Sequence, residues 1–138
     1  MTNLPSPTDI IEDLEFFDDW EERYQYIIDL SKQLPELSET ERTDDKIVKG
    51  CQSSVWLKST INGDRLHFDV ASDAVIVSGL LVLVLAAYQD QTAQTILDFD
   101  MDDYFKTLDL ERHISVTRGS GLRAIVGNIR QLATQHSS

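Results

Sequence analysis

The sequence contains one cysteine, Cys51, among 138 residues. A single cysteine excludes an internal disulfide, so the fold does not need an oxidising compartment. Basic residues are also scarce, because 12 Lys and Arg stand against 24 Asp and Glu and leave a net charge of −12. Nucleic-acid binding needs clusters of Lys and Arg that neutralise phosphates. The composition therefore argues against a nucleic-acid-binding protein.

We also expect no targeting or membrane segment. The first 22 residues carry eight carboxylates and no Lys or Arg, the opposite of a signal peptide or a mitochondrial presequence. The longest apolar run, 74–88, has 15 residues and includes Ser78 and Gly79. A membrane span needs about 20 apolar residues. We therefore expect a cytoplasmic protein without a membrane partner, in which this run is a buried helix.

The residues that are present have the balance of a globular protein. Apolar residues make up 41% of the chain and charged residues 26%. A chain of this length buries roughly two-thirds of its unfolded surface, which is enough for one core. No repeat, low-complexity segment or linker interrupts the sequence, so we expect a single domain over residues 1–138.

The clearest structural signal is a β-hairpin around residues 62–63, Asn-Gly, a favoured two-residue turn. Pairing outward from this turn places Val55 opposite Val70 and gives the hairpin one apolar face. That face consists of Val55, Leu57, Leu66, Phe68 and Val70. Cys51 has the same parity as the inward residues of the first strand. If the strand or its extension reaches that far, the thiol leans toward the core, and we expect it to be shielded at rest.

Helical spacing and capping residues predict helices around the hairpin. The expected fold is α+β: a small antiparallel sheet, made of the hairpin at about 53–71 and a short preceding strand, packs against several helices. The stripe of Trp20, Tyr24 and Ile28 is expected in the core. We expect a first helix at 8–17, capped by Thr8, and a second helix that is capped by Asp18 or Asp19 and ends near Leu34. The central helix is expected at 74–88, capped by Ser72 or Asp73. A terminal helix is expected to follow a Gly-rich loop at 118–123.

Metal and phosphate sites receive little support. The candidate metal ligands other than carboxylates lack ligand spacing; they are Cys51, His67, His113 and His136. An iron–sulfur cluster held by this chain alone is disfavoured, because such clusters take four ligands, mostly thiolates. The segment "RGSGLR" (118–123) lacks the Gly-Lys-Ser/Thr of a phosphate-binding loop. It is better interpreted as the entry to the last helix.

Cys51 itself has two interpretations. A free cysteine usually packs as a small hydrophobe. However, Lys46 and Lys49 would favour the reactive thiolate, and the small or polar side chains of 50–54 place the thiol on a loop that enters a strand. A Cys-His hydrolase also needs a base and an orienting partner, and His67 points outward in the predicted register. A thiol that only accepts and passes on a group needs neither.

Four segments carry a resemblance to a known family. They are "WEERYQYIIDLSKQLPEL" (20–37), "VKGCQSSVWL" (48–57), "SDAVIVSGLL" (72–81) and "SVTRGSGL" (115–122). Through these segments, and above all through the Gly-Cys-Gln-Ser-x-Val-Trp core, the chain resembles the SufE family over nearly its whole length. Members of this family are sulfur acceptors that partner cysteine desulfurases in iron–sulfur cluster assembly. One departure is "DDKIVKG" (44–50), which lacks an Asn often found shortly before the Gly.

The resemblance implies a sulfur carrier and not an enzyme. A pyridoxal-phosphate-dependent cysteine desulfurase, SufS-like or CsdA-like, would supply persulfide sulfur, and an iron–sulfur scaffold complex would receive it. The desulfurase would also turn over faster. By position, Cys51 carries the persulfide, Gly50, Gln52 and Ser53 shape its loop, and Arg118 occupies the family's Ser-x-x-Arg position nearby. The resemblance implies no cofactor or metal of the chain's own, because pyridoxal phosphate belongs to the desulfurase, and it leaves a homodimer open.

Two rival functions stay open at this point. The chain would be a non-covalent activator of the desulfurase if Cys51 were only structural. It would be a cysteine hydrolase if an acyl substrate labelled Cys51. The serine variant of Cys51 separates the carrier from the activator, because only the carrier needs the thiol.

Overall fold

The fold is α+β, with a three-stranded antiparallel sheet in the order β1-β2-β3 and several helices. The computed structural model describes residues 4–48, 54–112, 114 and 116–136. Its helices and strands are α1 (Pro7–Phe16), α2 (Trp20–Leu30), β1 (Val55–Asn62), β2 (Arg65–Ser72), α3 (Val75–Tyr88), β3 (Gln91–Thr92), α4 (Ala93–Asp98), α5 (Met101–Thr107) and α6 (Val116–His136). Short 3-10 helices are η1 (Ser31–Gln33), η2 (Glu39–Glu41), η3 (Asp44–Lys46) and η4 (Leu110–Arg112).

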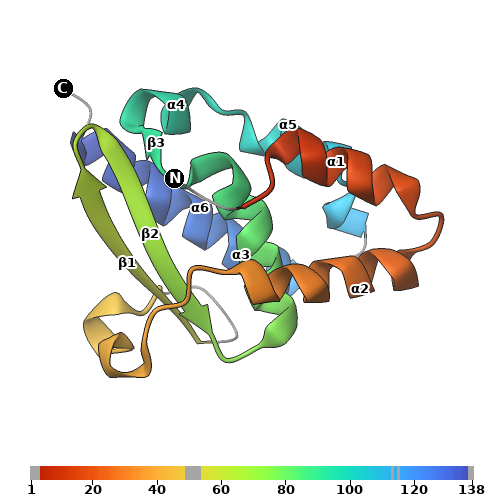
Figure 1. Cartoon of the computed structure of the whole chain (residues 1–138), viewed down its shortest axis with the longest axis horizontal. Helices are drawn as coiled ribbons and strands as arrows, with labels where there is room; N and C mark the ends of the chain where they lie inside the picture. Colours follow the sequence, from red (N-terminus) through yellow and green to blue (C-terminus); the bar gives the residue numbers. More distant parts are fainter. Residues whose placement is uncertain (1–3, 49–53, 113, 115, 137–138) are drawn as a thin grey trace.

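Helix α3 is the centre of the arrangement. It contacts β2 on one side, α1 and α2 on another, and also α4 and α6 (Figure 1). Its sequence is apolar nearly all round, and residues 77–85 are buried without interruption, as the sequence predicts for a central helix. No helix in the described ranges is long and apolar enough to span a membrane.

The hairpin has the predicted faces but a different register. Val55 pairs with Ser72 and not with Val70, so the second strand is shifted by two residues. The two central turn residues are Gly63 and Asp64, and only Gly63 has a positive φ, 65°. Glycine at the first of two turn positions is typical of a type II′ turn. A shift of two preserves the parity, so the predicted apolar residues are all buried: Val55, Leu57, Leu66, Phe68 and Val70.

The third strand follows α3 and does not precede the hairpin. Short β3 pairs with the first residues of β2. Before the hairpin, the described residues form isolated bridges, from Glu36 to Val70 and from Ile47 to Trp56. The expected short preceding strand is therefore reduced to single bridges, and the sheet is completed from the other side of the sequence.

The first two helices differ from expectation in detail. Ser6, not Thr8, caps α1: its Oγ accepts from the Asp9 N–H at 3.1 Å, and the Asp9 carboxylate accepts from the Ser6 N–H. Pro7 then occupies the first helical position, where its missing N–H costs nothing. Asp19 caps α2 as predicted.

The expected core stripe of α2 is partly wrong. Ile27 and Leu30 are the buried residues, while Trp20, Tyr24 and Ile28 are only half-buried. The reason is the close approach of α3, whose Gly79 lies against the backbone of Ile27 and turns that side of α2 inward.

The Gly-rich segment 118–123 is inside α6 and is not a loop before it. Helix α6 begins at Val116, so the expected entry to the last helix through a loop at 118–123 is wrong. Glycine lowers helix stability but does not prevent a helix when tertiary packing holds it. Here Leu122, Ile125 and Ile129 are buried in the core on the same helix.

Candidate functional site

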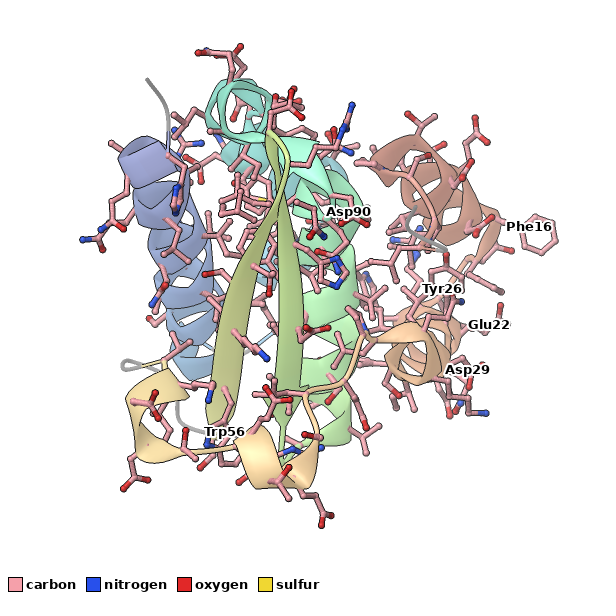
Figure 2. All side chains as sticks on the ribbon, turned by 60° about the vertical axis from the view of Figure 1, so that its left-hand side comes forward. Phe16, Glu22, Tyr26, Asp29, Trp56 and Asp90 are labelled. Carbon is pink, nitrogen blue, oxygen red and sulfur yellow. The ribbon has the colours of Figure 1, made fainter. Side chains whose placement is uncertain are left out.

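The candidate site lies at the end of the molecule where β1, α3 and α6 begin, which Figure 2 shows at the bottom, beside Trp56. We call this the loop end and define it by residues 46–48, 54–57 and 72–75. The predicted site residues Gly50, Cys51, Gln52 and Ser53 fall between Val48 and Ser54 and lie outside the described residues. The flanking residues are described, and they fix where this segment leaves and rejoins the fold.

The chain enters the segment from a buried position. The Val48 N–H donates to the Val55 carbonyl at 2.9 Å, and Val48 and Val55 are both almost fully buried. One residue earlier, Ile47 forms an antiparallel bridge with Trp56. Because these contacts fix Val48 beside β1, the connection to Ser54 starts and ends at the same place on the sheet.

The chain leaves the segment at an exposed anchor. The Ser54 N–H donates to Asp73 Oδ1 at 3.1 Å, and the Asp73 N–H donates back to the Ser54 carbonyl at 3.3 Å. Asp73 is itself exposed. This pair ties the first residue after the cysteine segment to the residues immediately before α3.

The use of Asp73 as a tether corrects the predicted cap of α3. The helix begins at Val75 after Ala74, without a capping side chain. The Ser72 Oγ accepts from the Ala74 N–H at 3.2 Å, and the Asp73 carboxylate is turned to Ser54. Both candidate caps therefore bond outside the first turn of α3, and Asp73 holds the loop end instead.

Two lysines near the site, Lys46 and Lys58, have partners among residues 36–46, which precede the site in the sequence. Lys58 pairs with Glu41, and Lys46 Nζ donates to Thr43 Oγ1 at 3.3 Å. The hydrogen bond from Lys58 lowers the pKa of Glu41, and the same bond raises the pKa of Lys58. Lys49 lies outside the described residues. Thiolate stabilisation by Lys46 and Lys49 stays a prediction.

Arg118 is the third residue of α6, so its backbone belongs to the first turn of that helix. Its side chain lies outside the described part of the chain. The expectation that Arg118 lies near Cys51 therefore stays a prediction, although α6 begins at the same end of the molecule as β1 and α3 (Figure 2).

One histidine that a hydrolase could use, His67, is engaged elsewhere. His67 faces outward on β2, as predicted, with Nδ1 at 2.7 Å from Asp90 Oδ1 and Nε2 at 3.4 Å from Asp69 Oδ1. Burial alone would lower the pKa of His67, but the bond and charge of Asp90, aided by Asp69, raise it overall. Within the described residues, no group of three or more His, Cys, Asp or Glu is placed to hold a metal ion.

Sequence reasoning missed two side chains that hold the sheet. Asp73 was expected to cap a helix, and Gln89, which bonds both backbone groups of Phe68 at 2.8 Å, was not considered. The signal for Asp73 is the hairpin register, because pairing Val55 with Ser72 brings Asp73 beside Ser54. That signal is lost when the register is two residues out.

The fold and the anchored chain ends define a small α+β domain whose single cysteine falls between a strand and its neighbouring bridge. The SufE family model, described as an Fe-S metabolism associated domain, matches residues 8–133. The chain therefore belongs to the SufE family, which connects it with iron–sulfur metabolism.

Relatives support this assignment along most of the chain. An uncharacterized SufE-like protein of Rhizobium etli is 42% identical over 134 residues, covering 94% of this chain and 90% of the relative. A second, of Rhizobium meliloti, is 42% identical over 137 residues and covers 96% of each. A solution structure of a hypothetical protein from Thermus thermophilus matches with a TM-score of 0.77 at 15% identity, covering 99% of this chain and 98% of that one. This last match shows the shared fold.

Proposed function

We propose that the protein is a sulfur carrier that accepts one sulfur atom from a cysteine desulfurase onto Cys51 and delivers it to an iron–sulfur scaffold. The main support is the position of the "KGCQSS" segment inside the SufE match, between chain ends anchored at Val48 and Ser54. By the same resemblance, Gly50, Gln52, Ser53 and Arg118 assist, either by shaping the loop or by contacting the partner.

The proposed step is a thiol exchange that needs no external oxidant or reductant. The Cys51 thiolate attacks the outer sulfur of the desulfurase persulfide, forming a new S–S bond while the original S–S bond breaks. The desulfurase cysteine leaves as a thiolate, and the transferred sulfur keeps its proton and its oxidation state. The product on this chain is a persulfide, which can repeat the exchange with a thiol of the scaffold.

This chemistry asks little of the surrounding protein. The attacking thiol works best with a pKa near ambient pH, so one basic neighbour or one loop amide is sufficient. General bases and cofactors are supplied by the desulfurase in its own reaction. An accessory protein with one thiol that becomes accessible when the partner docks therefore fits the role better than an enzyme with its own acid–base machinery.

Intact-mass analysis tests the proposal directly. The wild type and the Cys51→Ser variant are incubated with a SufS-like or CsdA-like desulfurase and cysteine, and the mass of each chain is measured. We expect the wild type to gain sulfur at Cys51 and the variant to gain none, while both keep the same far-UV circular dichroism. Sulfur mapped to any other residue would contradict the assignment.

The single cysteine supplies a matched control. Because Cys51 is the only thiol, alkylating the wild type blocks that residue alone without changing the sequence. We expect the alkylated protein and Cys51→Ser to lose stimulation of desulfurase turnover equally. Full stimulation by both would instead establish the non-covalent activator, and an acyl group captured on Cys51 would establish the hydrolase.

A further inference from the structure

A cavity of about 570 Å³ lies between α4, α5 and α6, and we call it the α6 cavity. One wall runs from the end of α4 into α5, with residues 97–102 and 105, and the other is α6, with residues 123, 126, 127 and 130. Helix α4 lies at the top of Figure 1 and of Figure 2, whereas the loop end lies at the bottom of Figure 2. The α6 cavity is therefore separate from the loop end, and its volume is typical of a small-molecule site.

The floor of the α6 cavity is apolar. It is formed by four side chains that are buried or half-buried: Phe99, Met101, Phe105 and Val126. On α6, Arg123, Gly127 and Arg130 follow one another at intervals of four and three residues, so they share one face of the helix. A Cβ on Gly127 would meet nothing within 4 Å. The helix therefore leaves open space between two arginines, where any other residue would place a side chain.

The charged groups around the cavity differ in burial. Arg130 is half-buried, whereas the other charged lining residues are exposed and so lie nearer the mouth. Each of the three lining carboxylates has a partner in the protein: Asp98 accepts from Gln94 at 2.8 Å, Asp100 accepts from the Asp103 N–H at 3.0 Å, and Asp102 lies 3.8 Å from Arg123. The mouth is thus acidic overall, and the most buried charge is a cation.

Arg130 has hydrogen-bond donors that the protein does not use. In the described part of the chain it forms no salt bridge, and its Nη1 donates to the Ile96 carbonyl at 3.4 Å, which is long for such a bond. A guanidinium group has five N–H donors. A cation that is partly removed from water is stabilised by an anion with which it can pair. Arg130 is therefore placed to receive an anion in the cavity.

A second polar group lies behind the cavity wall. Tyr88 is fully buried and packs in a T-shaped pair against Phe99, with ring centroids 6.2 Å apart. Burial raises the pKa of Tyr88, and the neighbouring Arg130 guanidinium opposes the rise. Within the described residues, the Tyr88 hydroxyl makes no hydrogen bond of ordinary geometry. Because buried polar groups are normally paired, the inner end of the cavity is a place where the protein's own hydrogen bonds are incomplete.

We propose that the α6 cavity binds a free α-amino acid with an apolar side chain. The carboxylate of the ligand accepts two parallel hydrogen bonds from Arg130, a geometry that guanidinium groups favour. The ammonium group of the ligand faces the carboxylates at the mouth, and its side chain packs on the apolar floor. Those same carboxylates disfavour a phosphate or a dicarboxylate, and a simple amine would leave Arg130 unpaired. The inference does not depend on the sulfur-carrier function.

Three probes of one shape test the class of ligand. L-phenylalanine carries both charged groups, 3-phenylpropionate lacks the ammonium group, and phenethylamine lacks the carboxylate. Each is titrated into the full chain, and the amide signals are followed by nuclear magnetic resonance. We expect L-phenylalanine to bind saturably, with a dissociation constant of about 1 mM or tighter, which is ordinary for a ligand of this size. Each analogue should bind about tenfold more weakly, and the shifted signals should belong to residues 97–102 and 123–130.

Arg130→Gln and Gly127→Leu each remove one feature of the site. The first removes the cation, and the second places a side chain in the open space beside it, so both should weaken binding of L-phenylalanine about tenfold or more. Gly127→Leu should not lower thermal stability, because leucine favours a helix more than glycine does. Arg112→Gln is the control, since it also removes one positive charge, but from an exposed position outside the cavity. It should bind as the wild type does.

The double variant Asp98→Asn/Asp102→Asn tests the acidic mouth. It should weaken binding of L-phenylalanine but not of 3-phenylpropionate, because only the first probe has an ammonium group. Equal binding of these two probes by the wild type would overturn the amino-acid assignment, as would displacement of L-phenylalanine by an equal concentration of inorganic phosphate. If none of the three probes gave saturable shifts, the site itself would be refuted. Sulfur uptake by Cys51 is measured separately, so the two proposals fail independently.

Discussion

Near the turn side of the hairpin, the buried side chain of Gln89 donates to the Phe68 carbonyl and accepts from the Phe68 N–H, each at 2.8 Å. At the opposite side, Ser54 is held by the exposed carboxylate of Asp73 at 3.1 Å. Around Gln89, Asp90 adds a bond from its N–H to the Leu66 carbonyl at 3.0 Å. We call this region, residues 65–68 and 89–90, the clamp end.

The buried bonds of Gln89 and the exposed bond of Asp73 differ in how costly they are to break. Hydrogen bonds in a buried site have no water to replace them, so breaking them leaves unpaired groups in the core. Exposed bonds exchange with water at small cost. Segments that must move for function come from the low-stability part of a protein. The proposed sulfur acceptor is thus at the end where one of the two anchors, the bond between Ser54 and Asp73, is exposed, while the bond between Val48 and Val55 is buried. The clamp end holds the sheet on α3.

The largest effect is expected at the clamp end. Replacing Gln89 with Leu keeps the volume but strands the buried N–H and C=O of Phe68. Each unpaired group costs about 1–3 kcal/mol, so we expect a loss of about 4 kcal/mol in the free energy of unfolding. Urea denaturation measures it. Gln94→Leu, at an exposed position of α4, should change the same quantity by less than about 0.5 kcal/mol. Similar losses in both variants would refute the clamp.

A second prediction concerns the support that both ends share, helix α3. A Cβ on Gly79 would lie 2.1 Å from the Ile27 carbonyl oxygen. Because backbone cannot yield cheaply, Gly79→Ala should destabilise the protein by about 3 kcal/mol. Gly127 in α6 is the matched control, since a Cβ there meets nothing within 4 Å. Gly127→Ala should stabilise by roughly 0.5–1 kcal/mol through helix propensity, and thermal melts of the two variants should move in opposite directions.

The third prediction tests the loop end. Asp73→Ala removes the acceptor of the Ser54 N–H, which water can replace, so unfolding free energy should fall by only about 1 kcal/mol. Loss of the anchor should nevertheless speed alkylation of Cys51 severalfold, because we expect the thiol to be shielded at rest. Asp73→Asn keeps the Oδ1 acceptor and should stay close to wild type. Unchanged alkylation in Asp73→Ala would mean that this anchor does not control the thiol.

The faces of the hairpin could be predicted, but its register could not. Alternation of apolar and polar residues fixes which side chains point inward, and a shift of two residues leaves that pattern intact. Asn62-Gly63 and Gly63-Asp64 are both acceptable turn pairs. The choice of the second comes from how β2 pairs with β3 and Gln89, contacts that local sequence does not contain.

The residues of the candidate site, too, could be predicted only where local sequence determines them. Cys51 could be singled out from its local sequence, because the Gly-Cys-Gln-Ser segment is contiguous. Asp73 and Gln89 act on residues 19 and 21 positions away, so their roles depend on tertiary pairing. Asp before an apolar helix is usually a cap, and here the tertiary contact with Ser54 overrides that local preference.

The smallest predicted effect is a pH dependence of the free energy of unfolding, which we expect from the clamp end and not from the loop end. At the clamp end, His67 lies between Asp90 and Asp69, and its pKa is raised above the usual value. Arg65 is the nearby cation, and it donates to the Asp90 carbonyl at 2.9 Å. A raised folded-state pKa means that the stabilisation is complete below the ordinary histidine pKa and is lost as pH rises through the raised value. For a half-exposed group we expect about 0.5 kcal/mol.

The free energy of unfolding is measured as pH rises from the ordinary histidine pKa through the raised value. We expect it to fall with pH in the wild type and to fall less steeply in His67→Gln. Asp90→Asn should flatten the slope as well, because it removes the larger of the two carboxylate contributions. Asp73→Asn, at the loop end, should leave the slope as it is in the wild type. A nuclear magnetic resonance titration that placed the pKa of His67 at or below its usual value would contradict the pairing of His67 with Asp90 and Asp69. The clamp end would then be held by Gln89 and by the backbone bond from Asp90 to Leu66, without a contribution from His67.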